Sequence, residues 1–446
     1  MTLHSLFTRA ALLSLVFISV ANSSIAQDNL SLDKAIQTAL ANNHQIRIRQ
    51  FDVDRTKLQV NPAMVGRKPT VNFNASYELG WSDTDTETLA LGPGQEGNTE
   101  IKLDGFSNDI IIGPEVNLLL LDGKASKYRL DQLATSSELA KLQLQQTMEQ
   151  TVADVSAAYL QMGEIQSQLS IIRQSIQLTQ DRLARTKQNA KYGTSNSLEA
   201  LQVEVDLKTD STTLRNLLLN YETANRNLNR LMGIDSEIPF VVDSQLVINT
   251  TIDVKELETA LKNQNTLLQL GQRNIQLADL DLELSRAAFK PTLSAYANAS
   301  FAYLQDDANF LQSTRSFGPN VGVRFSYPIA DGGARKIKEQ SALISQEQRR
   351  LERESNEEDL IKNLRNTFAS YQNILQQWRI EKSNLPTFER NLENLQNQYK
   401  LGLVTNTDVR SAQLNLNAAL SRINDYQYTI KQAEVQLYLL SGKLLK

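Results

Sequence analysis

The 446-residue chain contains no cysteine, so we expect neither disulfides nor a lipid on an N-terminal cysteine. Histidine is scarce as well, and only His44 lies beyond the first 26 residues. A metal site at His44 would need further ligands, but there is no HExxH motif, so a solvated or packed helix residue is the simpler interpretation. Glycine-rich phosphate loops are missing too. The sequence therefore predicts no cofactor, no metal site and no enzymatic activity.

Long hydrophobic runs and a strong charge imbalance are also lacking. With 46 basic and 50 acidic residues the formal net charge is −4, which argues against a nucleic-acid partner. The only long apolar stretch, residues 10–21, is too short to span a bilayer; with Arg9 before it and the small-x-small sequence Ser24-Ile25-Ala26 after it, residues 1–26 are predicted to be a secretory signal peptide. The mature chain is then soluble, peripheral, or membrane-embedded as a β-barrel.

What the chain does have is a long seam of apolar and small residues spaced alternately three and four apart, from Gly123 to Lys191. A second such segment runs from Gly332 to Lys400. This 3.5-residue period is typical of helices that supercoil around partners over many turns. At 1.5 Å per residue each segment predicts a helical rod of about 100 Å.

The two rods belong to an internal repeat. Three pairs of glycines are each 209 residues apart: Gly123 and Gly332, Gly193 and Gly402, and Gly233 and Gly442. The rods and the returning helices therefore have the same lengths in both copies, and an earlier loop differs in length between them. We therefore divide the mature chain into repeat 1, residues 27–239, and repeat 2, residues 240–446. The duplicated length indicates that length is the functional quantity.

Each repeat is predicted to contain a helix, two strands, a long helix and a returning helix. A Lys-Pro-Thr tripeptide ends the first helix of each repeat, because proline cannot continue a helix. The expected elements of repeat 1 are a helix over 32–66, strands at about 69–81 and 109–121 with a loop at 82–108, a long helix over 123–191 and a returning helix over 197–231. Those of repeat 2 are a helix over 254–289, strands at about 291–304 and 317–329, a long helix over 332–400 and a returning helix over 406–441.

Neither the strands nor the helices are complete in one chain. Strands in a bilayer must close into a barrel, and four are too few, whereas three chains supply twelve. The shorter helices are about half a rod each, so we expect 197–231 to stack end to end with 254–289, and the last helix with the first. The predicted fold is mainly α, with a coiled-coil helical barrel joined to a β-barrel shared between chains.

Over its mature length the sequence resembles the TolC family of outer-membrane efflux and secretion channels. The features that carry the resemblance are the duplicated element order, the junction from Tyr327 to Gly333 with its weaker twin Leu121-Asp122-Gly123, and the tip segment from Tyr399 to Val409. The resemblance implies a homotrimer with one 12-stranded outer-membrane barrel and a long periplasmic tunnel in a Gram-negative bacterium. It also implies a periplasmic adaptor (membrane fusion protein) and an inner-membrane RND or ABC transporter as partners, in multidrug export or type I secretion.

The resemblance further assigns residues to the periplasmic entrance. Asp408 falls where family members place an acid in the constriction, while Ser411 replaces the second acid and Val404 an arginine that helps to hold the gate closed. Glu199 takes the place of an acid after the first tip, and Tyr399 matches a gate tyrosine. Asp408 has an alternative role as a first-turn acid that the helix dipole favours. The adaptor-docking tips are predicted to be Tyr192, Gly193, Thr194, Leu401, Gly402 and Leu403, which could also be plain helix-ending turns.

Aromatic residues on or beside the strands are expected to form a girdle at the membrane interface rather than a soluble core: Trp81, Tyr77, Phe301, Tyr303 and Tyr327. The predicted function is a passive export duct for drugs, small toxins or secreted polypeptides. A structural coiled-coil stalk or adhesin is the alternative, but it needs no returning helices. A periplasmic adaptor should show one hairpin flanked by small β-domains, and this chain has two hairpins.

Overall fold

The computed structural model describes residues 29–88, 99–192, 197–243, 246–308 and 312–445. The predicted signal peptide, Gly193 and Thr194 lie outside these residues. The chain divides into two compact units, each built from segments of both repeats. Unit 1 comprises Met1–Ile48, Gln146–Asn265 and Asp359–Lys446, and unit 2 comprises Arg49–Gln145 and Thr266–Glu358. The division at residues 239 and 240 remains a prediction.

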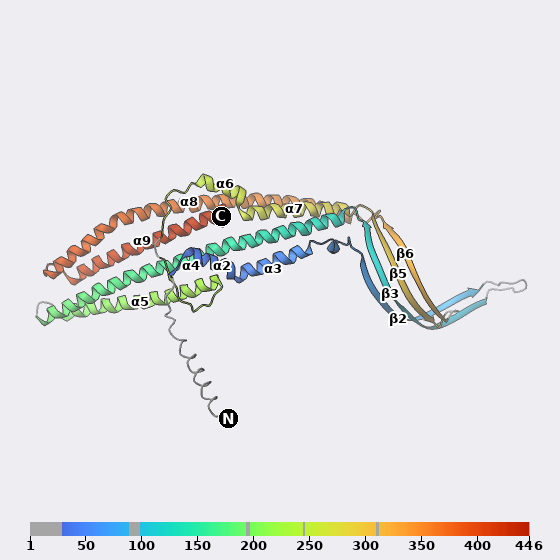
Figure 1. Ribbon diagram of the computed structural model, residues 1–446, viewed down its shortest axis with the longest axis horizontal. Coiled ribbons are helices and arrows are strands. Elements are labelled where there is room, and N and C mark those ends of the chain that lie inside the picture. The colour runs from blue at the N-terminus through green and yellow to red at the C-terminus, as the bar shows by residue number, and fades with distance from the viewer. Residues whose placement is uncertain (1–28, 89–98, 193–196, 244–245, 309–311, 446) are drawn as a thin grey trace, which may run out of the picture. The chain divides into compact units, whose positions relative to one another are not determined.

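Two helical hairpins dominate unit 1, while the first part of each long helix belongs to unit 2. The long helices α4 (Ala125–Lys191) and α8 (Ala334–Lys400) have 67 residues each, and the returning helices α5 (Ser197–Met232) and α9 (Asn406–Ser441) have 36 each. These lengths agree with the equal rods and returning helices predicted from the sequence. In Figure 1, α5 runs back along α4 and α9 runs back along α8.

The first helix of each repeat is broken, which corrects the continuous helices predicted over 32–66 and 254–289. Repeat 1 has α2 (Leu32–Asn42), α3 (His44–Gln59) and a 3-10 turn, η1 (Pro62–Val65). Repeat 2 has α6 (Val254–Gln264) and α7 (Thr266–Ala287). The breaks fall at Asn43 and Asn265, whose backbones leave helical geometry at ψ 126° and 124°.

The two asparagines explain the helix breaks and also show which helices pack together. The Asn43 side chain donates to the Leu231 carbonyl at 2.8 Å, and Asn265 donates to the Leu440 carbonyl at 2.9 Å. Each therefore binds a carbonyl in the last turn of a returning helix, which has no partner inside its own helix. Within unit 1, α2 packs on α5 and α6 packs on α9. The short helices thus meet the returning helix of their own repeat, so the predicted stacking of 197–231 with 254–289, and of the last helix with the first, is wrong.

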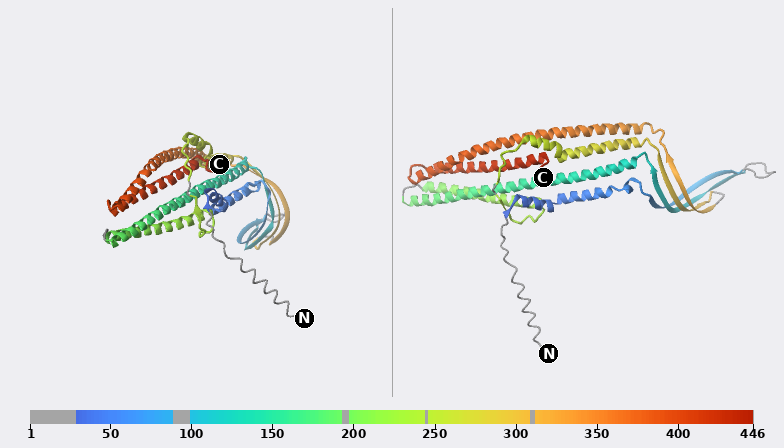
Figure 2. Two further views of the ribbon diagram at one scale, coloured as in Figure 1. Left: turned by 60° about the vertical axis from the view of Figure 1, so that its left-hand side comes forward. Right: turned by 45° about the horizontal axis from the view of Figure 1, so that its top comes forward.

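Unit 2 contains a four-stranded antiparallel sheet in the order β2-β3-β5-β6, and Figure 2 shows these strands side by side. Its strands are β2 (Thr70–Thr88), β3 (Thr99–Leu121), β5 (Thr292–Asp306) and β6 (Ser313–Ser326). The strands are longer than predicted, because pairing continues from Ser82↔Gly105 to Thr88↔Thr99 inside the segment expected to be a loop. Conversely, β6 stops at Ser326, before Pro328, rather than at 329.

A small parallel ladder in unit 1 joins the start of repeat 1 to the start of repeat 2, where β1 (Asn29–Leu30) pairs with β4 (Val241–Val242). The buried core beside it is built from α4 and α5, including Met162, Leu228 and Met232. Gly163 allows α9 to approach α4 closely, because a Cβ at this position would lie 2.8 Å from the Tyr428 hydroxyl. Among the helices of the described residues, none has an apolar stretch long enough to cross a membrane.

Candidate functional site at the tips of the helical hairpins

The turn between α8 and α9 is short and exposed. Gly402 has φ +75°, in the left-handed region that ends helices, and a Cβ there would meet nothing within 4 Å. Leu401 and Leu403 beside it are 75% and 72% exposed, and Tyr192 at the end of α4 is 74% exposed. Apolar side chains held out on such tips form a surface that another protein can cover.

Two of the predicted gate residues lie in direct contact. The Tyr399 hydroxyl at the end of α8 donates to Glu199 Oε1 at 2.9 Å, and it lies 3.0 Å from the Thr186 hydroxyl of α4. Burial raises the pKa of Tyr399, the Thr186 hydroxyl lowers it, and the Glu199 carboxylate raises it again. Tyr399 therefore stays a neutral donor that links the end of α8 to the start of α5.

Asp408 and Ser411 are both exposed on the first turns of α9. Asp408 closes a capping box, in which its carboxylate accepts from the Thr405 amide at 2.8 Å while the Thr405 hydroxyl accepts from the Asp408 amide at 3.3 Å. The Thr405 side-chain and backbone hydrogen bonds lower the pKa of Asp408. The first-turn role considered from the sequence is thus present.

A charged cluster that was not predicted lies deeper between the two hairpins. Arg410 of α9 makes a bidentate pair with Asp210 of α5, with nitrogen–oxygen distances of 2.9 and 2.7 Å. Arg182 of α4 binds Asp206 at 2.9 Å, and Arg410 Nε lies 3.6 Å from the same carboxylate. Two arginines and two aspartates therefore join three helices, and we call these four residues the charged cluster.

Hydroxyl and amide groups extend the charged cluster along α4. Ser175 and Thr179 donate to Asp210 Oδ2 at 3.2 and 3.3 Å. The amide of Gln413 donates to the Ser175 hydroxyl at 2.8 Å and lies 3.2 Å from the Thr179 hydroxyl. A buried polar network satisfied in this way fixes the register of the helices that contribute to it.

The pKa values of the two arginines in the charged cluster shift in opposite directions. Burial lowers the pKa of Arg182, and the neighbouring charge of Arg410 adds to this effect against the opposing influence of Asp206. For Arg410, burial alone would lower the pKa, but the bond to Asp210 outweighs it and the pKa is raised. Arg182 Nε and Nη1 are buried with no hydrogen-bond partner among the described residues.

Sequence reasoning found the tips but missed the charged cluster. Ser175, Thr179 and Thr186 are polar residues on the buried side of α4. The signal was the recurrence of polar residues at helical spacing, such as Asp206 and Asp210 four apart on α5. Their charge partner Arg410 lies 200 residues away from Asp210, and no spacing rule connects them.

The aromatic residues lie mostly on one exposed sheet face. Tyr77 pairs with Ile110, which pairs with Tyr303 on β5, so Tyr77 and Tyr303 share a face. Trp81 contacts Phe106 edge-to-face at 4.8 Å between ring centres. Tyr77, Trp81 and Phe301 are exposed, and Tyr327 lies one residue past the end of β6.

His44 is an exposed residue at the start of α3. Within the part of the chain that the structure describes, no group of three or more His, Cys, Asp or Glu residues is placed to hold a metal ion. The prominent polar features of unit 1 are therefore the hairpin tips and the charged cluster.

Comparison with known proteins gives consistent matches over most of the chain. The family described as outer membrane efflux protein matches residues 35–234 and 257–443. The probable outer membrane lipoprotein SilC of Salmonella typhimurium is 21% identical over 92% of this chain and 85% of its own. The toluene efflux pump outer membrane protein TtgC of Pseudomonas putida is 20% identical over 92% and 83%.

Solved structures share the fold. CusC superposes with a TM-score of 0.72 at 19% identity, covering 96% of each chain. The CmeC outer membrane channel of Campylobacter jejuni superposes with a TM-score of 0.73 at 15% identity, covering 93% of this chain and 86% of its own. The predicted fold class, helical with four antiparallel strands per chain in two repeated halves, is confirmed.

Proposed function

The chain belongs to the outer membrane efflux protein family, and from this premise we propose that three copies assemble into one export duct that a periplasmic adaptor connects to an inner-membrane RND or ABC transporter. The chain is an outer-membrane efflux channel with a periplasmic extension, a component of an efflux pump and not an enzyme.

The incomplete sheet supports the trimer. In the described residues β2 and β6 are edge strands, each with a single neighbour. Their apolar residues stand in solvent on one chain, with Phe317 75% and Val321 85% exposed. Unpaired backbone groups cannot be left in a bilayer, so β6 of one copy pairs with β2 of the next in a closed 12-stranded barrel. The exposed apolar face then contacts lipid, with Tyr77, Trp81, Phe301, Tyr303 and Tyr327 as its interfacial aromatics.

Detergent-purified protein tests the assembly. We expect a trimer by mass measurement and a steady conductance in a planar lipid bilayer. A monomer without conductance would refute the duct.

The exposed tips support adaptor docking. In this proposal Tyr192, Leu401 and Leu403 bind the adaptor, together with Gly193 and Thr194, and Gly402 sets the turn that presents them. A Gly402→Val change forces a β-branched residue to φ +75°. We expect it to abolish export in cells while the trimer still forms.

Gly332→Val is the matched control. Gly332 also has positive φ, +65°, and a Cβ on it would likewise meet nothing within 4 Å, but it lies at the other end of α8. The control substitution imposes similar backbone strain without touching the tip, so export should persist. Loss of export in both variants would assign the defect to folding rather than docking.

The cargo proposal rests on the relatives. Their names describe a toluene efflux pump and an antibiotic efflux pump. We therefore favour small toxic molecules over secreted polypeptides. Cells that produce this chain with its pump and adaptor should survive higher concentrations of such compounds than cells without it, and an unchanged tolerance paired with secretion of a polypeptide would reverse the choice.

A further inference from the structure

A small cavity lies in unit 1 between α4 and the hairpin of α8 and α9, next to the charged cluster. Its volume is about 120 Å³, and side chains of all three helices line it. A single water needs roughly 10–15 Å³ by the same kind of measure. The space therefore holds several waters or one small polyatomic ion.

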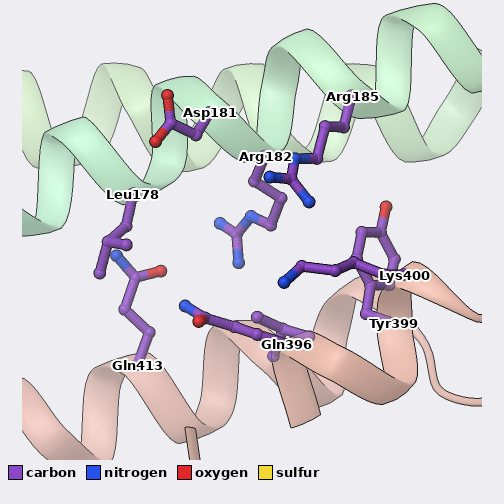
Figure 3. Close-up of a pocket in the computed structure, with 9 residues that line it drawn as sticks. Leu178, Asp181, Arg182, Arg185, Gln396, Tyr399, Lys400 and Gln413 are labelled. Atoms are coloured by element: carbon purple, nitrogen blue, oxygen red, sulfur yellow. The ribbon is translucent and has the colours of Figure 1, made fainter. Parts of the chain in front are cut away.

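The wall of this cavity is positively charged. Arg182, Arg185 and Lys400 line it together with the amides of Gln396 and Gln413. Figure 3 shows the Arg182 guanidinium in the middle of this group, with the ends of Gln396 and Lys400 directed toward the same space. The lining carboxylate, Asp181, lies on the other side of Arg182 from Lys400 in that view and is exposed.

Arg182 supplies the decisive observation. Its side chain is only 5% exposed, and only Nη2 is bonded, to Asp206. Nε and Nη1 are buried without a partner among the described residues. Buried donors are nearly always satisfied, so two orphaned guanidinium donors beside a polar cavity indicate a missing acceptor.

Both carboxylates of the charged cluster are already paired with arginines. Asp210 uses both oxygens for Arg410, and Asp206 accepts from Arg182 while lying 3.6 Å from Arg410. The charged cluster is thus balanced by itself, and Arg185 and Lys400 add positive charge at the rim. Among the described residues, Lys400 is held by Asn397 at 3.0 Å, an exposed contact on its own helix.

We propose that this cavity binds one small tetrahedral oxyanion of the phosphate or sulfate class, held by an open donor of the Arg182 guanidinium and by Arg185 and Lys400. The open nitrogens Nε and Nη1 lie on different edges of the guanidinium, so one oxygen of the anion accepts from one of them while the other oxygens face Arg185 and Lys400. The bound anion links α4 to the end of α8, so it fastens one hairpin to the other near the tip. This inference stands apart from the proposed trimer and docking surface.

Calorimetric titration of inorganic phosphate into the detergent-purified full-length protein, at constant ionic strength in chloride, tests the site. We expect one phosphate per chain, and at least a tenfold weaker affinity in Arg182→Gln. Arg173→Gln is the matched control, since Arg173 lies on the exposed side of the same helix and does not line the cavity. Its affinity should equal that of the unaltered protein.

Two further measurements keep the test decisive if Arg182→Gln disturbs folding. Arg185→Gln and Lys400→Gln alter exposed side chains, and each should weaken phosphate binding about threefold with the thermal unfolding midpoint in chloride unchanged. Acetate titrated in the same way should bind more weakly than phosphate. The proposal would be overturned if phosphate did not bind, if it bound all variants with equal affinity, or if acetate bound more tightly. A structure determined in phosphate that showed only waters on Arg182 would overturn it as well.

Discussion

The pair between Arg410 and Asp210 allows a quantitative test of how the two hairpins are held together. The side chains are 12% and 6% exposed, so Arg410→Met leaves a buried carboxylate without its cation. Removing one partner of a buried pair costs about 3–5 kcal/mol. Ser175 and Thr179 still donate to Asp210, so we expect the lower end, about 3 kcal/mol.

Hydrogen exchange of the assembled protein measures this loss locally. A cost of about 3 kcal/mol corresponds to roughly 100-fold faster exchange of amides that open when α9 separates from α5. Arg422→Met is the matched control on the same helix, because Arg422 is 45% exposed while its partner Glu381 is 15% exposed, so that water screens one end of this pair. Exposed pairs contribute about 0.2–1 kcal/mol, and we expect this half-exposed pair to lie at the upper end, so that its amides exchange about fivefold faster.

The double variant Asp210→Leu/Arg410→Met separates lost attraction from stranded charge. Replacing both partners by apolar residues removes the unpaired carboxylate, so exchange should return part of the way toward the unaltered protein. Equal exchange in Arg410→Met and Arg422→Met would refute the idea that burial gives this pair its weight. A double variant worse than Arg410→Met would show that direct attraction, not stranded charge, dominates.

Three further predictions concern single residues. Asp408→Asn should weaken block by multivalent cations and shift ion selectivity in bilayer recordings, and unchanged selectivity would remove Asp408 from the entrance. Because the pKa of Asp408 is lowered in the fold, its stabilising effect is present above the unfolded pKa of about 4 and is lost as the pH falls through the folded pKa. After correction for the slower intrinsic exchange of amides at low pH, the first turn of α9 should therefore be less protected at pH 3 than at pH 5, and Asp408→Asn should diminish this difference. Gly163→Ala gains about 1 kcal/mol in helix propensity, but the added methyl group pushes against buried Tyr428 at a cost of about 1–3 kcal/mol. Chemical denaturation should therefore show a lower free energy of unfolding. A higher one would mean that Tyr428 moves aside freely.

The sequence predicted the long helices best because their signal is long and local. A seam over 67 residues with glycine at the turns leaves little choice, and α4 and α8 begin within two residues of the predicted starts and end as predicted. The helix breaks were missed because Asn43 and Asn265 act through carbonyls of distant helices. Asparagine is common inside helical sequence patterns, so its presence alone does not predict such a contact.

The strands were underestimated for a different reason. Asp83 and Asp85 are exposed, and this part of β2 lacks the apolar alternation that marks a strand. The ladder continues there to Thr88 because pairing, once in register from Thr70 onward, extends through backbone hydrogen bonds that need no apolar side chain. Polar strand ends of this kind depend on their neighbours rather than on their own composition.

The internal repeat does not predict the charged cluster, because the two copies differ at its positions. The 209-residue offset places Ala419 at the position equivalent to Asp210, and Leu201 at the position equivalent to Arg410. The aspartate and the alanine are both buried, so the duplication preserved the helices while the two copies acquired different chemistry at matching sites. Asp206 and Asp210 on α5 contact Arg410 on α9. If two α5 helices packed together instead, their aspartates would repel each other. This pattern favours contact between unlike hairpins over contact between like ones, a discrimination that two identical repeats could not provide.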